Sequence, residues 1–249
     1  MDRYYHSVEY FNEKYYIIGG SDNSTLKKSI IEIDFKNGSC KELAEMNEYR
    51  CYVSTAVLGD YIYALGGLNG TDRLNSAERY DPKSDVWTRI SDMNVVRSDA
   101  SACVHNGKIF IAGGLNSLSI EASLECYDPI NDSWMLMESM LSPRSSFSLI
   151  TYNDQLYALG GNDGFERLCY VETYDFRSNQ WLPIDPMNTR RSTFKAIVLN
   201  DELYAIGGYD GEHATQTVEK FNSKSQCWLN VSKLIVARTA FALACYREY

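Results

Sequence analysis

The chain has 249 residues, a net charge of −9 at pH 7 and a composition of 45% hydrophobic and 23% charged residues, as is typical of a folded globular domain. The acidic balance disfavours nucleic acids and anionic membranes as partners, because both are bound by concentrated lysine and arginine surfaces. The first residues lack the apolar core of a signal peptide, and no apolar run approaches the length of a membrane span. We therefore expect a cytoplasmic protein, with the nucleus as the alternative compartment.

A fixed period of 47 residues runs through the chain. Five Gly-Gly pairs follow it, at Gly19-Gly20, Gly66-Gly67, Gly113-Gly114, Gly160-Gly161 and Gly207-Gly208. Tryptophan keeps the same period at Trp87, Trp134, Trp181 and Trp228, with Cys40 in the first copy. An arginine occurs six times at this spacing, at Arg3, Arg50, Arg97, Arg144, Arg191 and Arg238. Such a period indicates a repeat architecture, and we expect a single domain over 1–249 with repeats at about 3–49, 50–96, 97–143, 144–190 and 191–237.

Each repeat contains four β-type runs in a fixed order. The arginine precedes a first strand, expected at about 4–11, 51–58, 98–105, 145–152, 192–199 and, in an extra copy within 238–246, at 239–246. A polar pair then leads to the second strand; its third copy is Asn106-Gly107, a strong signal for a type I′ hairpin. The glycine pair follows, then a third strand such as 76–80, a second turn, and a fourth strand that holds the tryptophan. Four short strands per repeat, without helical periodicity, predict an all-β propeller.

The invariant positions read as scaffold. Glycine pairs allow the backbone to pass where a Cβ would clash, and tryptophan suits the space between adjacent blades. The arginine is present in every repeat, whereas a site for one asymmetric ligand should vary between blades. We therefore expect it to satisfy backbone or carboxylate groups within each blade.

The run Ile62-Tyr63-Ala64-Leu65-Gly66-Gly67, with Glu78-Arg79-Tyr80-Asp81-Pro82 and Trp87, resembles the kelch repeat over essentially the full chain. The segment 70–78 is especially similar to kelch-like proteins, in which BTB and BACK domains precede a six-bladed kelch propeller. This resemblance implies a substrate-recognition module of a cullin-3 ubiquitin-ligase adaptor, which binds a client peptide at the mouth of the central channel. The alternative is an actin-binding or other cytoskeletal kelch scaffold with no role in ubiquitination.

The sequence departs from the kelch-like pattern in two respects. Cullin-3 would be reached only through a BTB domain, and no BTB or BACK region is present here. Six arginine-led first strands accompany only five sets of second to fourth strands. We expect an incomplete, N-terminally truncated six-blade propeller with one extra closing-type strand; closure as five blades with a redundant strand is the alternative.

Variable positions between the repeats are the expected binding surface, since the scaffold positions do not vary. One ring follows each arginine and comprises Tyr4, Cys51, Ser98, Ser145, Ser192 and Thr239. A second ring follows each glycine pair and comprises Ser21, Leu68, Leu115, Asn162 and Tyr209. A third comprises Leu26, Arg73, Ile120, Arg167 and Ala214. The resemblance implies that the first two rings hold the ligand; Arg73 and Arg167 would suit an acidic peptide, or would instead pair with Asp72 and Glu166.

Catalysis is not expected. The three histidines occupy unlike repeat positions, and the seven cysteines lack any C-x-x-C pair, so neither a metal site nor a disulfide framework is indicated. No nucleophile elbow or phosphate-binding loop is present. We predict a binding protein without cofactor or metal.

Overall fold

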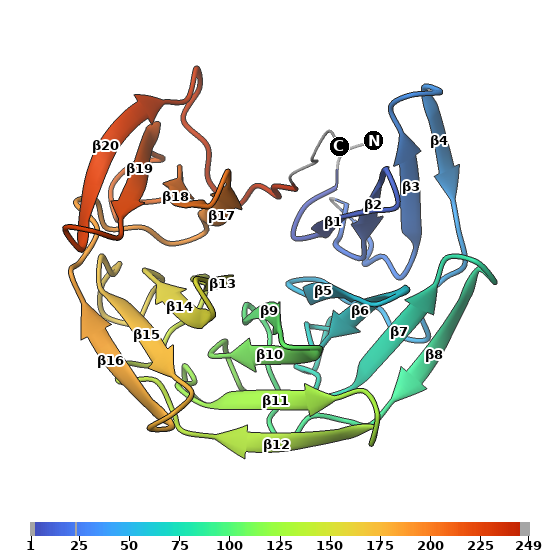
Figure 1. Ribbon diagram of the computed structural model, residues 1–249. Coiled ribbons are helices and arrows are strands. Elements are labelled where there is room, and N and C mark those ends of the chain that lie inside the picture. Colours follow the sequence, from blue (N-terminus) through green and yellow to red (C-terminus); the bar gives the residue numbers. More distant parts are fainter. Residues whose placement is uncertain (1–2, 23, 245–249) are drawn as a thin grey trace.

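The computed structural model describes residues 3–22 and 24–244, and it places five four-stranded antiparallel sheets around one axis (Figure 1). Each sheet is a meander of consecutive strands, in the order β1-β2-β3-β4 in the first blade and likewise in the others. This arrangement confirms the predicted all-β propeller. Among the described residues, no helix is long and apolar enough to cross a membrane.

The strands occupy equivalent places in blades 1 to 5. The first strands lie nearest the axis and are β1 (Ser7–Phe11), β5 (Ser54–Leu58), β9 (Ser101–His105), β13 (Ser148–Tyr152) and β17 (Lys195–Leu199). The second strands are β2 (Lys14–Ile18), β6 (Tyr61–Leu65), β10 (Lys108–Ala112), β14 (Gln155–Leu159) and β18 (Glu202–Ile206). The third strands are β3 (Ile30–Asp34), β7 (Ala77–Asp81), β11 (Leu124–Asp128), β15 (Val171–Asp175) and β19 (Thr217–Asn222). The outer strands are β4 (Ser39–Glu42), β8 (Val86–Ile90), β12 (Ser133–Met137), β16 (Gln180–Ile184) and β20 (Cys227–Lys233).

The predicted tight hairpin between first and second strands is confirmed. His105 of β9 pairs with Lys108 of β10, which leaves a two-residue turn. Its residues Asn106 and Gly107 have φ of 46° and 71°, the left-handed values that a type I′ turn requires.

Each first strand begins three residues later than predicted. In blade 3, Asp99 has φ of 54°, and this left-handed conformation cannot continue a strand. Ser98 before it forms an isolated bridge with Leu115, and β9 starts only at Ser101. In all five blades the residue after the arginine therefore lies outside the first strand, in a separate bridge to the residue that follows the glycine pair.

The glycine pairs mark the contact between consecutive blades. Gly113 has φ of 62°, and a Cβ there would lie 2.3 Å from the carbonyl oxygen of Arg144 in the next blade. Gly114 has φ of 95°, and its Cβ would lie 2.6 Å from the carbonyl oxygen of Ser98. The Gly114 N–H donates to the Arg144 carbonyl at 2.7 Å. A side chain at either position would clash with backbone, which confirms the scaffold role of these glycines.

The recurring arginine is a buried clamp inside its own blade. Arg97 donates from Nη1 to the Gly113 carbonyl at 2.8 Å and from Nη2 to Glu125 Oε1 at 2.7 Å. Glu125 Oε2 in turn accepts the backbone N–H of Asn94, from the segment after β8, at 2.7 Å. Arg50, Arg144 and Arg191 pair with Glu78, Glu172 and Glu219 in the same way. In blade 1 the carboxylate position holds Ile31, and within the described ranges Arg3 donates to Gly19 and Ser29 alone.

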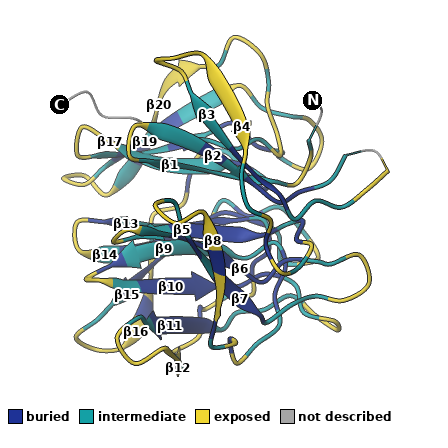
Figure 2. Ribbon diagram, turned by 90° about the vertical axis from the view of Figure 1, so that its right-hand side faces the viewer, coloured by how far each residue is buried: buried dark blue, intermediate teal, exposed yellow. Residues whose placement is uncertain are grey.

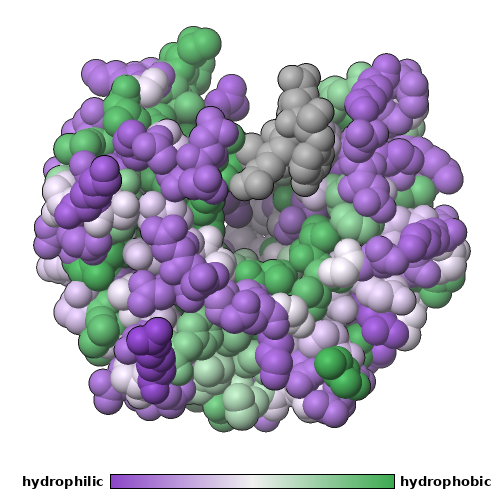
Figure 3. Space-filling model, viewed as in Figure 1, coloured by the Kyte–Doolittle hydropathy of each residue, from purple (hydrophilic) through white to green (hydrophobic). Residues whose placement is uncertain are grey.

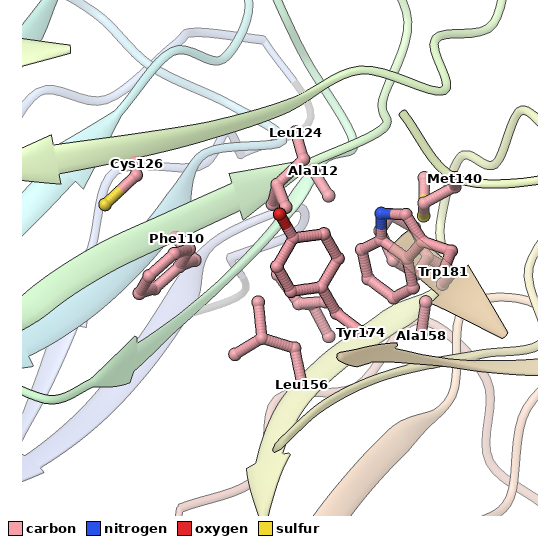
Figure 4. Packing of buried hydrophobic residues seen from close by; sticks show 11 residues of the cluster. Phe110, Ala112, Leu124, Cys126, Met140, Leu156, Ala158, Tyr174 and Trp181 are labelled. Atoms are coloured by element: carbon pink, nitrogen blue, oxygen red, sulfur yellow. The ribbon is translucent and has the colours of Figure 1, made fainter. Parts of the chain in front are cut away.

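The hydrophobic core lies between the blades. Tyr174 of β15 and Trp181 of β16 pack against Phe110 and Leu124 of blade 3 (Figure 4). The Trp181 indole N–H also donates to the carbonyl of Glu138, in the segment after β12, at 3.0 Å. Buried residues accordingly concentrate in the second and third strands, and exposed ones in outer strands and loops (Figure 2). The predicted role of tryptophan between blades is confirmed.

The ring is interrupted between blades 5 and 1, where the segment after β20 enters the break (Figure 1). The expected extra strand at 239–246 is not formed over residues 239–244, and Cys245 and Tyr246 lie outside the described residues. A second-strand partner for this segment is absent from the five sheets. The preceding blade also lacks the hydrogen-bond acceptor that holds a first strand elsewhere. Ser101 and Ser148 accept backbone N–H groups from the first strand of the next blade, whereas the same position in blade 5 is Lys195.

Candidate functional site

The three predicted rings meet at one end of every blade, which we call the rim face. In blade 3, Ser98 and Leu115 exchange backbone hydrogen bonds at 3.0 and 2.7 Å, and Leu115 also bridges to Ile120. Equivalent bridges run through Tyr4, Ser21 and Leu26, through Cys51, Leu68 and Arg73, through Ser145, Asn162 and Arg167, and through Ser192, Tyr209 and Ala214. Thr239 has no such bridge within the described residues, but its hydroxyl lies 2.5 Å from that of Thr193.

Exposure differs between the rings. Ser98, Ser145 and Ser192 are almost fully buried, at 2%, 2% and 3% exposure. Their hydroxyls support the other rings: those of Ser145 and Ser192 donate to the carbonyls of Asn162 and Tyr209 at 3.3 and 3.4 Å. Members of the second and third rings are partly exposed, as are Tyr4 and Thr239 at the two ends of the first. A partner would therefore meet the second and third rings first, with the serines beneath them.

Arg73 and Arg167 do not form the ion pairs with Asp72 and Glu166 that the sequence offered as an alternative. Arg73 donates from Nε to the Ser98 hydroxyl at 3.0 Å. No carboxylate lies within ion-pair distance of either guanidinium among the described residues.

The surroundings of Arg167 hold its guanidinium in place without neutralising it. Arg167 donates from Nη1 to Asn162 Oδ1 at 3.0 Å, and its guanidinium lies over the Tyr209 ring at 5.4 Å. Glu166 instead pairs with Arg190. The Arg167 Nε–H is buried without a partner in the described part of the chain. Both arginines of the third ring thus keep binding capacity for an external carboxylate.

Two apolar loop tips on the rim face were missed by the sequence analysis. Leu118 and Phe165 stand four residues beyond the glycine pairs of blades 3 and 4, and both are 96% exposed. The same position in the other copies holds Ser24, Thr71 and Glu212. A hollow of about 660 Å³ adjoins Phe165 and includes Arg167, Arg190 and Tyr209 in its wall. The available signal was an apolar residue in a loop position that is polar elsewhere.

The mouth of the central channel was also missed. The second residue after each arginine has left-handed φ between 49° and 56°, and these residues are Tyr5, Tyr52, Asp99, Ser146, Thr193 and Ala240. Their backbones form a head-to-tail ladder, in which each N–H from Tyr52 to Ala240 donates to the carbonyl of the preceding member at 2.8 to 3.1 Å. This ladder surrounds a pocket at the centre of the ring, where the space-filling view shows a hollow (Figure 3). The ladder positions vary between repeats as much as the three rings do, so the same period could have revealed them.

Charged groups gather in this channel. Desolvation raises the pKa of Asp99 to about 6, against which hydrogen bonds from Ser98 and Ser146 and the charge of Arg73 act. His6 and Lys195 line another part of the pocket, and burial lowers the pKa of both. Burial raises the pKa of Glu9, whose Oε1 accepts the Thr55 hydroxyl at 2.5 Å and whose charge interacts with Lys195.

The histidines stand in three unlike settings. His105 stacks on Phe176 at 4.6 Å, His6 lines the channel pocket and His213 lies exposed in a rim loop. Within residues 3–22 and 24–244, no group of three or more His, Cys, Asp or Glu side chains is placed as metal ligands would be. The six cysteines of this region are free.

Comparison with known proteins identifies the repeat. Residues 1–161 match the family model of the KLHDC2/KLHL20/DRC7 Kelch-repeats domain, and residues 143–188 and 190–235 match that of the kelch motif. The chain belongs to the kelch-repeat family. A solved structure entitled "Structure of YjhT" resembles this kelch domain with a TM-score of 0.85 and 16% identity, over 99% of the present chain and 88% of the other. That likeness supports the kelch propeller fold alone, and a search of the curated proteins found no match. Placement among BTB-BACK-kelch proteins stays a prediction.

Proposed function

We propose that this kelch propeller binds a client protein through the rim face of blades 2 to 5 and the adjoining channel mouth. The observation that carries the proposal is the pair of apolar side chains at the rim. Leu118 and Phe165 project from adjacent blades at 96% exposure, and Phe165 shares a hollow with the Arg167–Tyr209 pair. Exposed apolar groups next to arginine and tyrosine are typical of contact sites between proteins.

Acidic groups on the client would suit this surface. Arg73 and Arg167 each hold a guanidinium positioned by a neutral oxygen, from Ser98 and Asn162 respectively. A guanidinium that lacks a carboxylate partner can donate two parallel hydrogen bonds to a carboxylate of a ligand. We therefore infer a client segment that combines apolar and acidic side chains.

The test is quantitative capture of proteins from the native cell lysate on the immobilised chain. The double variants Leu118→Ser/Phe165→Ser and Arg73→Ala/Arg167→Ala should each lose the same discrete client by at least about ten-fold, because removing central contacts at interfaces costs about 2 kcal/mol or more. Circular dichroism checks that each variant folds.

The matched control is Ile130→Ser. Ile130 is also apolar and 91% exposed, but it lies in the turn between β11 and β12, at the opposite end of the blade. Its variant should capture the client as the unchanged chain does. Equal loss in this control, or equal capture by all variants, would contradict binding at the rim face.

The ligase role is a further part of the proposal, supported by the similarity of residues 70–78 to kelch-like proteins. A BTB domain joined to this propeller would bring cullin-3 to the client. Ubiquitination of the captured client should then require both cullin-3 and the rim residues. Actin co-sedimentation that the rim variants leave unchanged, without client capture, would favour the cytoskeletal scaffold instead.

A further inference from the structure

The central pocket is built from equivalent residues of all six arginine-led segments. The ladder residues and those that follow them surround a space of about 140 Å³. A cavity of about 150 Å³ accommodates a ring the size of benzene, so this space suits one inserted side chain. The pocket lies at the channel mouth, next to the buried serines of the first ring.

Asp99 is the one residue with a carboxylate in the described lining of the pocket. Its Oδ2 accepts the Ser98 hydroxyl at 3.1 Å and its Oδ1 the Ser146 hydroxyl at 3.4 Å. No lysine or arginine lies within ion-pair distance of it in the described ranges. The backbone is held on both sides, because Asp99 N–H donates to Tyr52 at 3.1 Å and its carbonyl accepts from Ser146 at 2.9 Å. The carboxylate is therefore preorganised, and its hydrogen-bond donors among the described residues are neutral hydroxyls.

The fold has no need for a charge at this position. Serine, threonine, tyrosine and alanine occupy it in the other copies and make the same ladder hydrogen bonds. A half-buried carboxylate whose hydrogen-bond donors are neutral hydroxyls is destabilising, as the raised pKa of Asp99 indicates. A destabilising group that the scaffold does not require is commonly kept for binding.

The neighbouring aromatic pair points to a cation. Tyr52 precedes Asp99 on the ladder, and its ring stacks on that of Tyr5 at 4.2 Å. Aromatic rings beside a carboxylate are typical of sites for organic cations. Two positive groups lie nearby: Arg73 donates to the Ser98 hydroxyl, and the charge of Lys195, which also lines the pocket, interacts with that of Glu9.

We propose that Asp99, with Tyr5 and Tyr52, binds a cationic side chain of the client, a lysine ammonium or an arginine guanidinium that enters along the channel axis. This inference rests on the proposed client binding at the rim face and adds a basic residue to the client segment. Acidic groups of the client would contact Arg73 and Arg167 while its basic residue occupies the pocket.

Small probes test the pocket without a known client. n-Butylguanidinium and n-butylammonium are titrated into the whole chain at pH 7.5, with the amide signals of Tyr52, Asp99 and Ser146 followed by NMR. Neutral n-butylurea, which has nearly the same shape, and butyrate serve as comparisons. We expect saturable shifts with the two cations only.

Asp99→Asn should weaken cation binding at least ten-fold, and asparagine tolerates the left-handed backbone of this position. The control Asp72→Asn removes an exposed rim carboxylate and should bind as the unchanged chain does. Asp99→Ser, which copies the residue of blade 4, provides a second variant that the ladder accommodates. Equal binding of n-butylurea and n-butylguanidinium, preference for butyrate, or full binding by Asp99→Asn would overturn the proposal.

Lowering the pH gives an independent readout. At pH 5.0 about nine-tenths of a carboxyl with a pKa of about 6 is protonated, so cation binding should fall about ten-fold from its value at pH 7.5. Besides Asp99, the titratable groups of the pocket lining are Tyr5, His6, Tyr52 and Lys195, and the charges of Arg73 and Glu9 act on Asp99 and Lys195 respectively. His6→Phe, which copies Phe147 and Phe194, should retain this dependence; its loss would assign the effect to His6 and contradict the role of Asp99.

The two proposals fail separately. Client capture that depends on Leu118, Phe165 and the rim arginines, without cation binding, would remove only the inference about Asp99. Cation binding that depends on Asp99, with client capture unchanged in every rim variant, would remove only the proposed rim surface.

Discussion

Asp99 holds a desolvated carboxylate whose pKa is raised from 3.8 to about 6. A raised pKa means that the folded state binds the proton more tightly than the unfolded chain does. Below about pH 4 the side chain is mostly protonated in both states, so its desolvation does not lower the free energy of unfolding. The free energy of unfolding falls as the pH rises through the folded-state pKa near 6.

Replacing this carboxyl group should stabilise the protein at neutral pH. Asp99→Asn removes the titration and retains an oxygen for Ser98 and Ser146. We expect little difference in the free energy of unfolding at pH 4 and a gain of up to about 3 kcal/mol at pH 8, from a shift of about two pKa units. Urea unfolding at several pH values measures it, with Asp72→Asn as the control. A variant that is equally destabilised at both ends of this range would contradict the desolvated carboxylate.

Consecutive blades are joined by a repeated tryptophan contact. Trp87, Trp134 and Trp181 each donate an indole hydrogen bond to a carbonyl of the preceding blade at 2.8 to 3.0 Å. Trp228 is about as buried between blades 4 and 5 as Trp181 is between blades 3 and 4, but its Nε1 has no partner among the described residues. The last blade junction thus has the packing of the others without the hydrogen bond.

This difference predicts unequal costs for one substitution. Trp181→Phe and Trp228→Phe remove similar volumes from sites that are 3% and 4% exposed. Only the first breaks a hydrogen bond and leaves the Glu138 carbonyl unpaired, so it should lower the free energy of unfolding by about 1 to 2 kcal/mol more. Chemical denaturation of the two variants in parallel tests this. Equal losses would show that the indole hydrogen bond adds nothing to the stability of the blade junction.

The 47-residue period was enough to predict the blades, because glycine, arginine and tryptophan each meet a backbone or carboxylate constraint that recurs in every copy. The starts of the first strands were predicted too early because the left-handed residue before them cannot be recognised by its type. Tyrosine, serine and alanine take the same conformation as Asp99 in the other copies. Leu118 and Phe165 were missed since neither belongs to a ring defined beside an invariant residue. The local pattern also predicted a strand over residues 239–244. Pairing there depends on a partner strand and on a serine hydrogen bond, and Lys195 stands where that serine would be.

The break between blades 5 and 1 makes the molecule uneven in its packing. Blades 2 to 4 have a neighbour on both sides, and each of their second strands β6, β10 and β14 has four buried residues. In contrast, the second strands β2 and β18 of the end blades have two buried residues each. In a repeat protein stability is close to a sum of repeat and interface contributions, so the blades that border the break lack one of these contributions.

Hydrogen exchange should report this gradient directly. We expect the amides of β6, β10 and β14 to exchange through global unfolding, and those of β2 and β18 to exchange at least ten-fold faster through local opening of the two end blades. The strands compared are all second strands, each paired on both sides, so the comparison isolates the missing blade interface. Mass spectrometry of labelled peptides under native conditions measures the rates. Equal protection in all five blades would mean that a further interface closes the ring in solution, and it would contradict the predicted gradient.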